Sequence, residues 1–216
     1  MSSTKRLAGV RRVNMYVDGF NLYHALDQQA EPPLKWLNLR ELARTFLAPG
    51  EALNRVVYFT AVLTWDHEKQ RRHRTYIAAQ RAVGVDVVES IFKKVTKHCR
   101  TAARNCSRYE EKQTDVALAV AMLSDAMRND YDRAILITAD SDQIPLLKEL
   151  RASFPEKPIT LAAPPGRAKD ARELGAIAAD RKPLTVERLR ACPLPRDVRD
   201  ADGKSVASMP AAYARR

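Results

Sequence analysis

Two aspartates, Asp140 and Asp142, follow directly on an apolar, β-branched run, Ala134–Thr138, and precede a segment of helical periodicity that ends at Leu150. This order of residues predicts a buried strand, a tight acidic turn and a helix. Open α/β proteins bind their ligands in a crevice outside the carboxyl ends of parallel strands, so both carboxylates would project into such a crevice. Carboxylates gathered there could bind a divalent cation.

Two further aspartates are expected at the same edge. Asp18 ends the apolar run Val13–Val17, and adjacent strands lie only about 4.8 Å apart, so it would meet the acidic turn if the two strands are neighbours. Asp115 stands in the first turn of a helix predicted over Thr114–Arg128, which precedes the strand before Asp140 and must begin at that edge. Asp125 lies about 15 Å further along the helix axis and should be out of reach.

Four carboxylates without a lysine among them repel one another at pH 7, and a hard divalent cation relieves the repulsion. Ligands that are rich in oxygen and poor in histidine favour Mg²⁺ or Mn²⁺ over zinc. Such an ion orients a phosphate and lowers the pKa of a bound water, as phosphodiester hydrolysis requires. Asn21 could bind the metal or a water, or cap a helix. Each residue also has a simpler interpretation. Asp18 could only form an Asp-Gly turn, Ser141 or Asp142 could cap the next helix, and Asp115 could only stabilise the N-terminus of its helix through the helix dipole.

Strands and helices alternate along the chain with short Gly/Pro connections, which predicts an α/β fold with a parallel sheet of about five strands and helices on both faces. Asn38 is expected to cap one helix, and Gly84 to follow the end of another. The predicted strands are 13–17, 55–63, 85–92, 133–138 and 158–163, and the predicted helices are 20–26, 38–47, 66–83, 114–128, 144–150 and 170–179.

The composition describes one soluble globular domain of 216 residues, with 45% hydrophobic and 29% charged residues and a net charge of +11. No apolar run is long enough to cross a bilayer, and the basic N-terminus leads into no signal core. Three cysteines, an odd number, favour a reducing cytoplasm over a disulfide framework. We expect a basic extension over 1–12, one domain over 13–193, and an extended or partly disordered tail over 194–216.

The positive charge is concentrated between Lys69 and Arg108, a segment that contains eleven lysines and arginines and only two acidic residues. A polyanion, most often nucleic acid, explains such a surplus better than solubility does, although a solvated basic face is the simpler alternative. The candidate phosphate contacts are Arg71, Arg72, Arg74, Lys93, Lys94 and Lys97. His98, Cys99 and Cys106 could bind zinc, but their spacing is not a standard one.

Three motifs in this order, YVDGFNL at 16–22, EKQTDVALA at 111–119 and ITADSD at 137–142, resemble the NYN domain, a branch of the PIN-like nucleases that includes the LabA-like bacterial proteins. The likeness covers residues 13–179. It implies a PIN-like, Rossmann-related three-layer α/β/α fold and Mg²⁺- or Mn²⁺-dependent ribonuclease activity. The metal-binding acids of the family map onto Asp18, Asp115, Asp140 and Asp142, and its motif asparagine maps onto Asn21.

Two positions need separate comment within this resemblance. Lys112 matches a family lysine just ahead of the second acid, and we group it, with Ser141, among the candidate nucleic-acid contacts. Many relatives carry another aspartate where this chain has Ala121. The missing carboxylate would weaken a second metal position.

The leading hypothesis is therefore a cytoplasmic, metal-dependent endoribonuclease that acts on RNA, with DNA and homo-oligomers left open and no membrane partner. The alternative is an RNA-binding or adaptor module with little or no cleavage. A third hypothesis is a metal-dependent phosphatase on small phosphates, because Asp-x-Asp after a strand also occurs there. The basic surplus exceeds what a small substrate needs, which disfavours the third.

Overall fold

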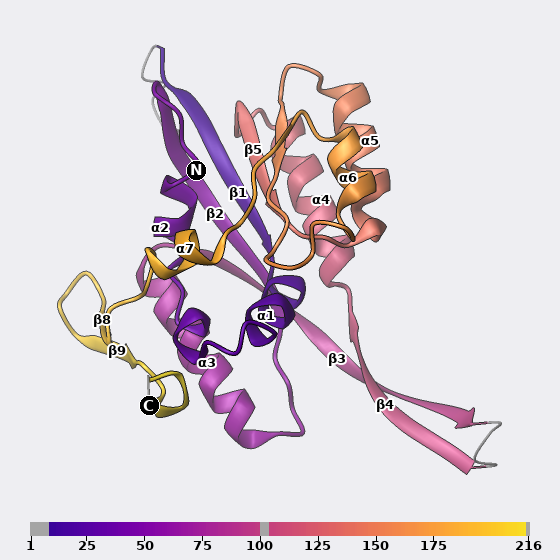
Figure 1. Ribbon diagram of the computed structural model, residues 1–216, viewed down its shortest axis with the longest axis vertical. Coiled ribbons are helices and arrows are strands. Elements are labelled where there is room, and N and C mark those ends of the chain that lie inside the picture. Colours follow the sequence, from indigo (N-terminus) through magenta and orange to yellow (C-terminus); the bar gives the residue numbers. More distant parts are fainter. Residues whose placement is uncertain (1–8, 100–103, 215–216) are drawn as a thin grey trace.

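The computed structural model describes residues 9–99 and 104–214, and within residues 93–112 it describes the backbone alone. At its centre is a seven-stranded sheet in the order β4-β3-β2-β1-β5-β6-β7, in which β4 is antiparallel to β3 and the other pairs are parallel (Figure 1). The strands are β1 (Arg11–Asp18), β2 (Glu51–Ala61), β3 (Asp86–Cys99), β4 (Arg104–Lys112), β5 (Arg133–Ile137), β6 (Ile159–Leu161) and β7 (Asp180–Arg181). The predicted α/β fold with a mainly parallel sheet is confirmed.

Helices cover both faces of the sheet and complete three layers. Alternate residues of β1 face opposite ways, so Val17 joins one core with Leu42, while Tyr16 joins the other with Leu118. The first layer contains α1 (Gly19–Asp27), α2 (Leu39–Arg44), α3 (His67–Ala82) and α7 (Val186–Arg190), and the second contains α4 (Thr114–Met127), α5 (Ile144–Ser153) and α6 (Arg172–Ile177).

The local signals that delimit the helices behave as expected. The Asn38 side chain accepts hydrogen bonds from the first turn of α2, and Asp66 does the same for α3. Gly84 follows the end of α3 with a φ of +81°, a backbone conformation that glycine adopts without steric cost. The predicted helix ends at Asn38 and Gly84 are confirmed.

The order of the strands reverses beside β1, because β2 and β3 lie on one side of it and β5 and β6 on the other. Val17 of β1 pairs with Ile137 of β5, so these strands end side by side. The condition on which the acidic edge depends, that the first and fourth predicted strands are neighbours, is therefore met. Such a reversal is the place where open α/β sheets bind ligands.

The basic stretch after residue 92, which was assigned to no element, contains strand. β3 continues to Cys99 and β4 returns from Arg104, and the two form an antiparallel arm that leaves the body of the molecule (Figure 1). The third predicted strand was therefore too short. Strand pairing across an arm depends on a partner segment, which periodicity within one segment does not show.

The C-terminal segment, expected to be extended or partly disordered over 194–216, is described over residues 194–214 and contains a β-hairpin. β8 (Asp197–Arg199) pairs with β9 (Ser205–Ser208), and Val198 and Ala207 are buried in a third apolar cluster with Trp36. The Trp36 indole donates to the Pro195 carbonyl oxygen at 2.8 Å. The apolar residues of this segment are too few and too far apart to show a helical or strand periodicity. Their burial follows from contact with the cluster around Trp36, which the sequence does not show.

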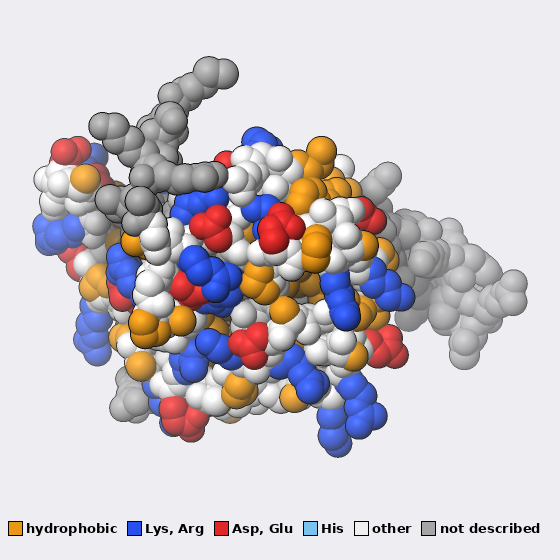
Figure 2. Space-filling view, turned by 90° about the horizontal axis from the view of Figure 1, so that it is seen from above, with side chains coloured by type: hydrophobic (Ala, Val, Ile, Leu, Met, Phe, Trp, Pro, Cys, Tyr) orange, Lys and Arg blue, Asp and Glu red, His pale blue; other side chains and the backbone are white. Residues whose placement is uncertain are grey.

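Figure 2 shows the molecule from the side at which β1 begins, where blue and red side chains are interspersed. Near the start of the strands, Arg133 pairs with Glu51 at 2.6 Å, and Arg12 pairs with Asp132 at 2.9 Å. These pairs neutralise charge at the edge of the sheet opposite to the carboxylate cluster described below. No helix within the described ranges has the length and apolar character needed to cross a membrane.

Candidate metal centre

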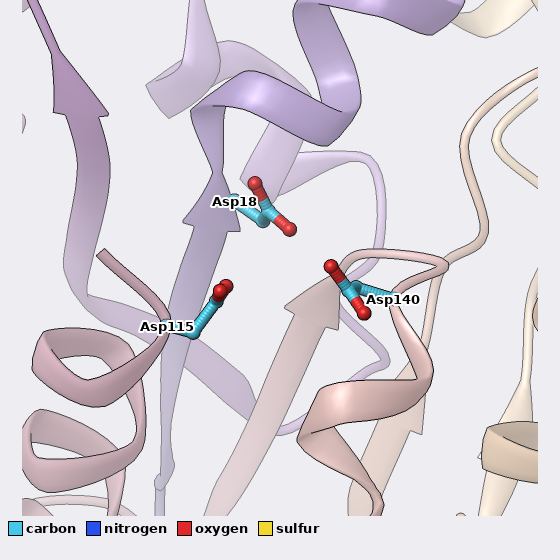
Figure 3. Close-up of side chains that lie close together, drawn as sticks. All are labelled: Asp18, Asp115 and Asp140. Carbon is cyan, nitrogen blue, oxygen red and sulfur yellow. The ribbon is translucent and has the colours of Figure 1, made fainter. Parts of the chain in front are cut away.

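Three of the four candidate aspartates meet at the carboxyl ends of β1 and β5. One carboxylate oxygen each from Asp18, Asp115 and Asp140 lies within 4.8 Å of the other two (Figure 3). Asp18 ends β1, Asp115 lies in the first turn of α4, and Asp140 follows β5. Three elements remote in the sequence thus present oxygens to one point.

Asp18 is the most buried member, with 4% of its surface exposed. Its Oδ1 accepts from the Asn21 backbone N–H at 3.0 Å, and its Oδ2 accepts from the Thr138 hydroxyl at 2.8 Å. Burial raises the pKa of the Asp18 carboxyl to about 6, against the lowering effect of these two hydrogen bonds. The charges of its two acidic neighbours, Asp115 and Asp140, also contribute to this rise.

Thr138, which the sequence analysis did not select, connects two members of the cluster. While its hydroxyl donates to Asp18, the same oxygen accepts from the backbone N–H of Asp140 at 3.1 Å. The residue is fully buried, so this link is shielded from water. A hydroxyl residue two positions before the first aspartate of the turn was the signal that could have found it.

The geometry of the acidic turn separates Asp140 from Asp142. Asp140 caps the short 3₁₀ helix η2 (Ser141–Gln143) by accepting from the Asp142 backbone N–H at 2.9 Å. Asp142 itself is exposed and does not belong to the group within 4.8 Å. The cap of the following helix that was expected at Ser141 or Asp142 is not found: Asp140 caps η2, and α5 begins after Gln143, whose side chain makes no capping bond. Ser141 is exposed at the start of η2.

The carboxylate of Asp115 lies close enough to Asp140 and Asp142 for the charges of both to act on it. Burial raises the pKa of Asp115, the charges of Asp140 and Asp142 raise it further, and a hydrogen bond from Gln143 lowers it. Without a cation the cluster therefore resists full ionisation. A donor set made of carboxylate oxygens alone fits a hard divalent cation such as Mg²⁺ or Mn²⁺.

Asn21 contacts the centre through the backbone. Its side-chain oxygen accepts from the Ala139 N–H at 3.1 Å, which ties the first turn of α1 to the residue before Asp140. Because its own N–H also binds Asp18, Asn21 holds the two strand ends together. Its side-chain oxygen is thus already engaged in a structural hydrogen bond.

Asp125 lies far from this centre, as the length of α4 predicts. It is fully buried and accepts from the Tyr16 hydroxyl at 2.6 Å and from Arg55 at 3.1 Å. Its charge is therefore balanced within a separate network. Ala121, where many relatives of the family carry an acid, packs against the apolar core of the second helical layer.

The candidate phosphate contacts are spread over α3 and the β3–β4 arm. Arg74 pairs with Glu89 at 2.6 Å, and Arg71 and Arg72 line a cleft against the C-terminal segment near Pro210. The side chains of Lys93, Lys94, Lys97 and Lys112, and those of the zinc candidates His98, Cys99 and Cys106, lie outside the described residues.

At position 19, beside Asp18, there is no room for a side chain larger than that of glycine. The reason is close packing and not backbone conformation, because φ of Gly19 is not positive. A Cβ on this residue would lie 2.5 Å from the Phe59 carbonyl oxygen and 2.5 Å from a ring carbon of Tyr58. We expect Gly19→Ala to displace the start of α1, to cost about 1–3 kcal/mol of stability and to weaken metal binding through Asp18. Urea unfolding and Mn²⁺ titration measure the two effects, and wild-type values in both would contradict this account.

The fold and the centre define a class: a doubly wound α/β protein with a carboxylate cluster where the strand order reverses. The chain belongs to the NYN domain family, whose model matches residues 12–178. It is 24% identical over 224 residues, 86% of this chain and 70% of the relative, to a Pseudomonas putida protein named 6-hydroxy-3-succinoylpyridine 3-monooxygenase HspA. A Vibrio parahaemolyticus protein of unknown function shares the fold, with a TM-score of 0.55 and 16% identity over 85% of this chain and 98% of that one.

Proposed function

We propose that this NYN domain is a metal-dependent ribonuclease that hydrolyses phosphodiester bonds within an RNA chain. The observation that carries the proposal is the group of three carboxylates at the point of strand reversal. Asp18, Asp115 and Asp140 would hold Mg²⁺ or Mn²⁺, with Asp142 adding negative charge nearby. The ion supplies orientation of the phosphate, a more acidic water and stabilisation of the leaving oxygen.

The residues of the chain keep the ligands in place. Thr138 sets the distance between Asp18 and the turn at Asp140, and Asn21 fixes the same turn to α1. Both bridges join segments that are more than a hundred residues apart in the sequence. Ligands held by such contacts lose little freedom when an ion binds, which favours binding.

A long polyanionic substrate is supported by the surroundings of the centre. β3 is parallel to β1 and runs past the edge where the carboxylates lie, so the β3–β4 arm with its many lysines and arginines starts beside them. Phe20, Tyr23 and Trp65 are exposed aromatic side chains after the carboxyl ends of β1 and β2. Positive charge binds phosphates and aromatic rings stack on bases, a combination typical of single-stranded nucleic-acid binding.

We place the activity in the cytoplasm, with RNA as the partner. Cys192 is a buried free thiol, which agrees with a reducing compartment.

The expected result of the decisive test is cleavage of a labelled RNA by the purified chain in Mg²⁺ or Mn²⁺, and none in EDTA. Asp140→Asn should lower the cleavage rate at least about a hundred-fold, because a neutral amide binds a divalent cation poorly. Binding of RNA should persist in this variant and decrease with salt, because the lysines and arginines are unchanged. Gel-based cleavage and fluorescence anisotropy measure the two quantities.

Each alternative gives a different outcome in this test. Salt-sensitive RNA binding without turnover in either metal would indicate an adaptor module, and release of phosphate from a small ester without RNA cleavage would indicate a phosphatase. Conversion of 6-hydroxy-3-succinoylpyridine, the compound in the name of the Pseudomonas relative, without RNA cleavage would overturn the proposal. So would equal cleavage by wild type and Asp140→Asn.

A further inference from the structure

Gln143, the last residue of η2, lies against the carboxylate cluster and has only 1% of its surface exposed. Its side-chain amide nitrogen is 3.3 Å from the Asp115 Oδ1 and 3.5 Å from the Asp115 carbonyl oxygen. Both contacts are long, and both lead to the same residue. The amide thus faces the carboxylate and the backbone of Asp115 together.

The orientation of this amide follows from its neighbours. If nitrogen and oxygen were exchanged, the amide oxygen would face a carboxylate and a carbonyl oxygen, which offer no proton. The nitrogen therefore points at Asp115. As a result Oε1 of Gln143 is buried and has no hydrogen-bond partner among the described residues. A buried acceptor without a donor costs stability.

Gln80 is a buried glutamine whose amide nitrogen and amide oxygen both form hydrogen bonds within the fold. It is also fully buried, and its nitrogen donates to the Leu37 carbonyl oxygen at 2.6 Å. Its oxygen accepts from the Leu39 N–H at 3.3 Å. Gln143 lacks the second bond, so its position is not explained by folding alone.

We propose that Gln143 is a positioning residue for the metal centre: its amide nitrogen holds the Asp115 carboxylate toward Asp18 and Asp140, and the fold tolerates an unsatisfied buried amide oxygen to keep that donor in place. This role rests on the proposed function. Second-sphere groups of this kind orient ligands and tune affinity.

The proposal predicts effects of opposite sign on stability and on metal binding. Gln143→Leu removes the unpaired oxygen and keeps the volume, so the EDTA-treated variant should unfold at the wild-type temperature or above. The same change removes the donor to Asp115, and the Kd for Mn²⁺ without RNA should rise about 10- to 100-fold. Gln143→Met should behave in the same way, because methionine resembles glutamine in length and is unbranched at Cβ and Cγ.

The matched control is Gln80→Leu, which should lower the unfolding temperature of the metal-free chain and leave the Kd for Mn²⁺ unchanged. Calorimetric titration with Mn²⁺ alone at pH 8 and thermal unfolding in EDTA give both readouts for each variant. Mn²⁺ binding by the wild type with the same Kd in Gln143→Leu would overturn this role alone. If both Gln143 variants unfold as early as Gln80→Leu, Gln143 serves folding and the inference is overturned. If the folded wild type binds no Mn²⁺, the proposed function fails together with this role.

Discussion

Asp18→Asn is expected to abolish metal-dependent cleavage and, at the same time, to stabilise the metal-free chain at neutral pH. The rate should fall about a thousand-fold or more, because Asp18 is the most buried of the three proposed ligands and a neutral amide replaces its charge. The asparagine oxygen can still accept from the Asn21 N–H, so the cap of α1 survives, and the amide nitrogen that replaces Oδ2 can donate to the Thr138 hydroxyl oxygen.

The gain in stability follows from the raised pKa of Asp18. Folding moves that pKa from 3.8 to about 6, so above pH 6 the folded chain holds an ionised carboxylate in a site that disfavours it. A difference of roughly two pH units corresponds to a cost of at most about 3 kcal/mol. The cost is fully present above pH 6 and disappears below about pH 4, where Asp18 is protonated in both states.

Urea unfolding of both proteins in EDTA, at pH 8 and at pH 4, measures this difference. Asp18→Asn should be the more stable protein at pH 8, and the two should converge at pH 4. Asp202→Asn, which changes an exposed acid in the β8–β9 turn, is the control and should match the wild type at both values. A variant that is less stable than wild type at pH 8, or one that still cleaves RNA at the wild-type rate, would contradict the account of the centre.

Arg133→Met is expected to cost about 3–5 kcal/mol of stability and to leave Mn²⁺ binding unchanged. Arg133 is 7% exposed, and it reaches Glu51 at 2.6 and 2.7 Å, the Thr160 hydroxyl at 2.9 Å and the Phe46 carbonyl oxygen at 3.0 Å. It therefore joins the amino ends of β5, β2 and β6. Removing it leaves the Glu51 carboxylate, whose side chain is 3% exposed, with the more distant Arg11 at 3.8 Å and the Ala48 N–H.

The double variant Arg133→Met with Glu51→Met separates the loss of the pair from the penalty of an unpaired charge. Because most of the cost of the single change comes from the carboxylate left behind, the double variant should recover a large part of the lost stability. Urea unfolding of the two single variants and the double variant gives the coupling. Additive losses would show that the pair acts as two independent side chains.

Much of the α/β fold was readable from the sequence, and the reason is local. Asn38 caps its helix as its residue type predicts, and the apolar run before Asp140 forms a buried strand. Runs of this kind need no distant partner to be recognised. The β3–β4 arm and the hairpin after Leu194 escaped prediction because their stability comes from pairing with other segments.

The sequence by itself determined which edge of the sheet is acidic. Alternation of strands and helices places Asp18, Asp115 and Asp140 at the same edge and places Asp125 beyond reach, since helix rise and strand direction follow from topology alone. Only the tertiary structure decided which oxygens meet. It turned Asp142 outward, joined Asp18 to the acidic turn through Thr138, and put the amide of Gln143 against Asp115. Separations of a few ångströms depend on hydrogen bonds between residues distant in the chain, and no periodicity within a segment records them.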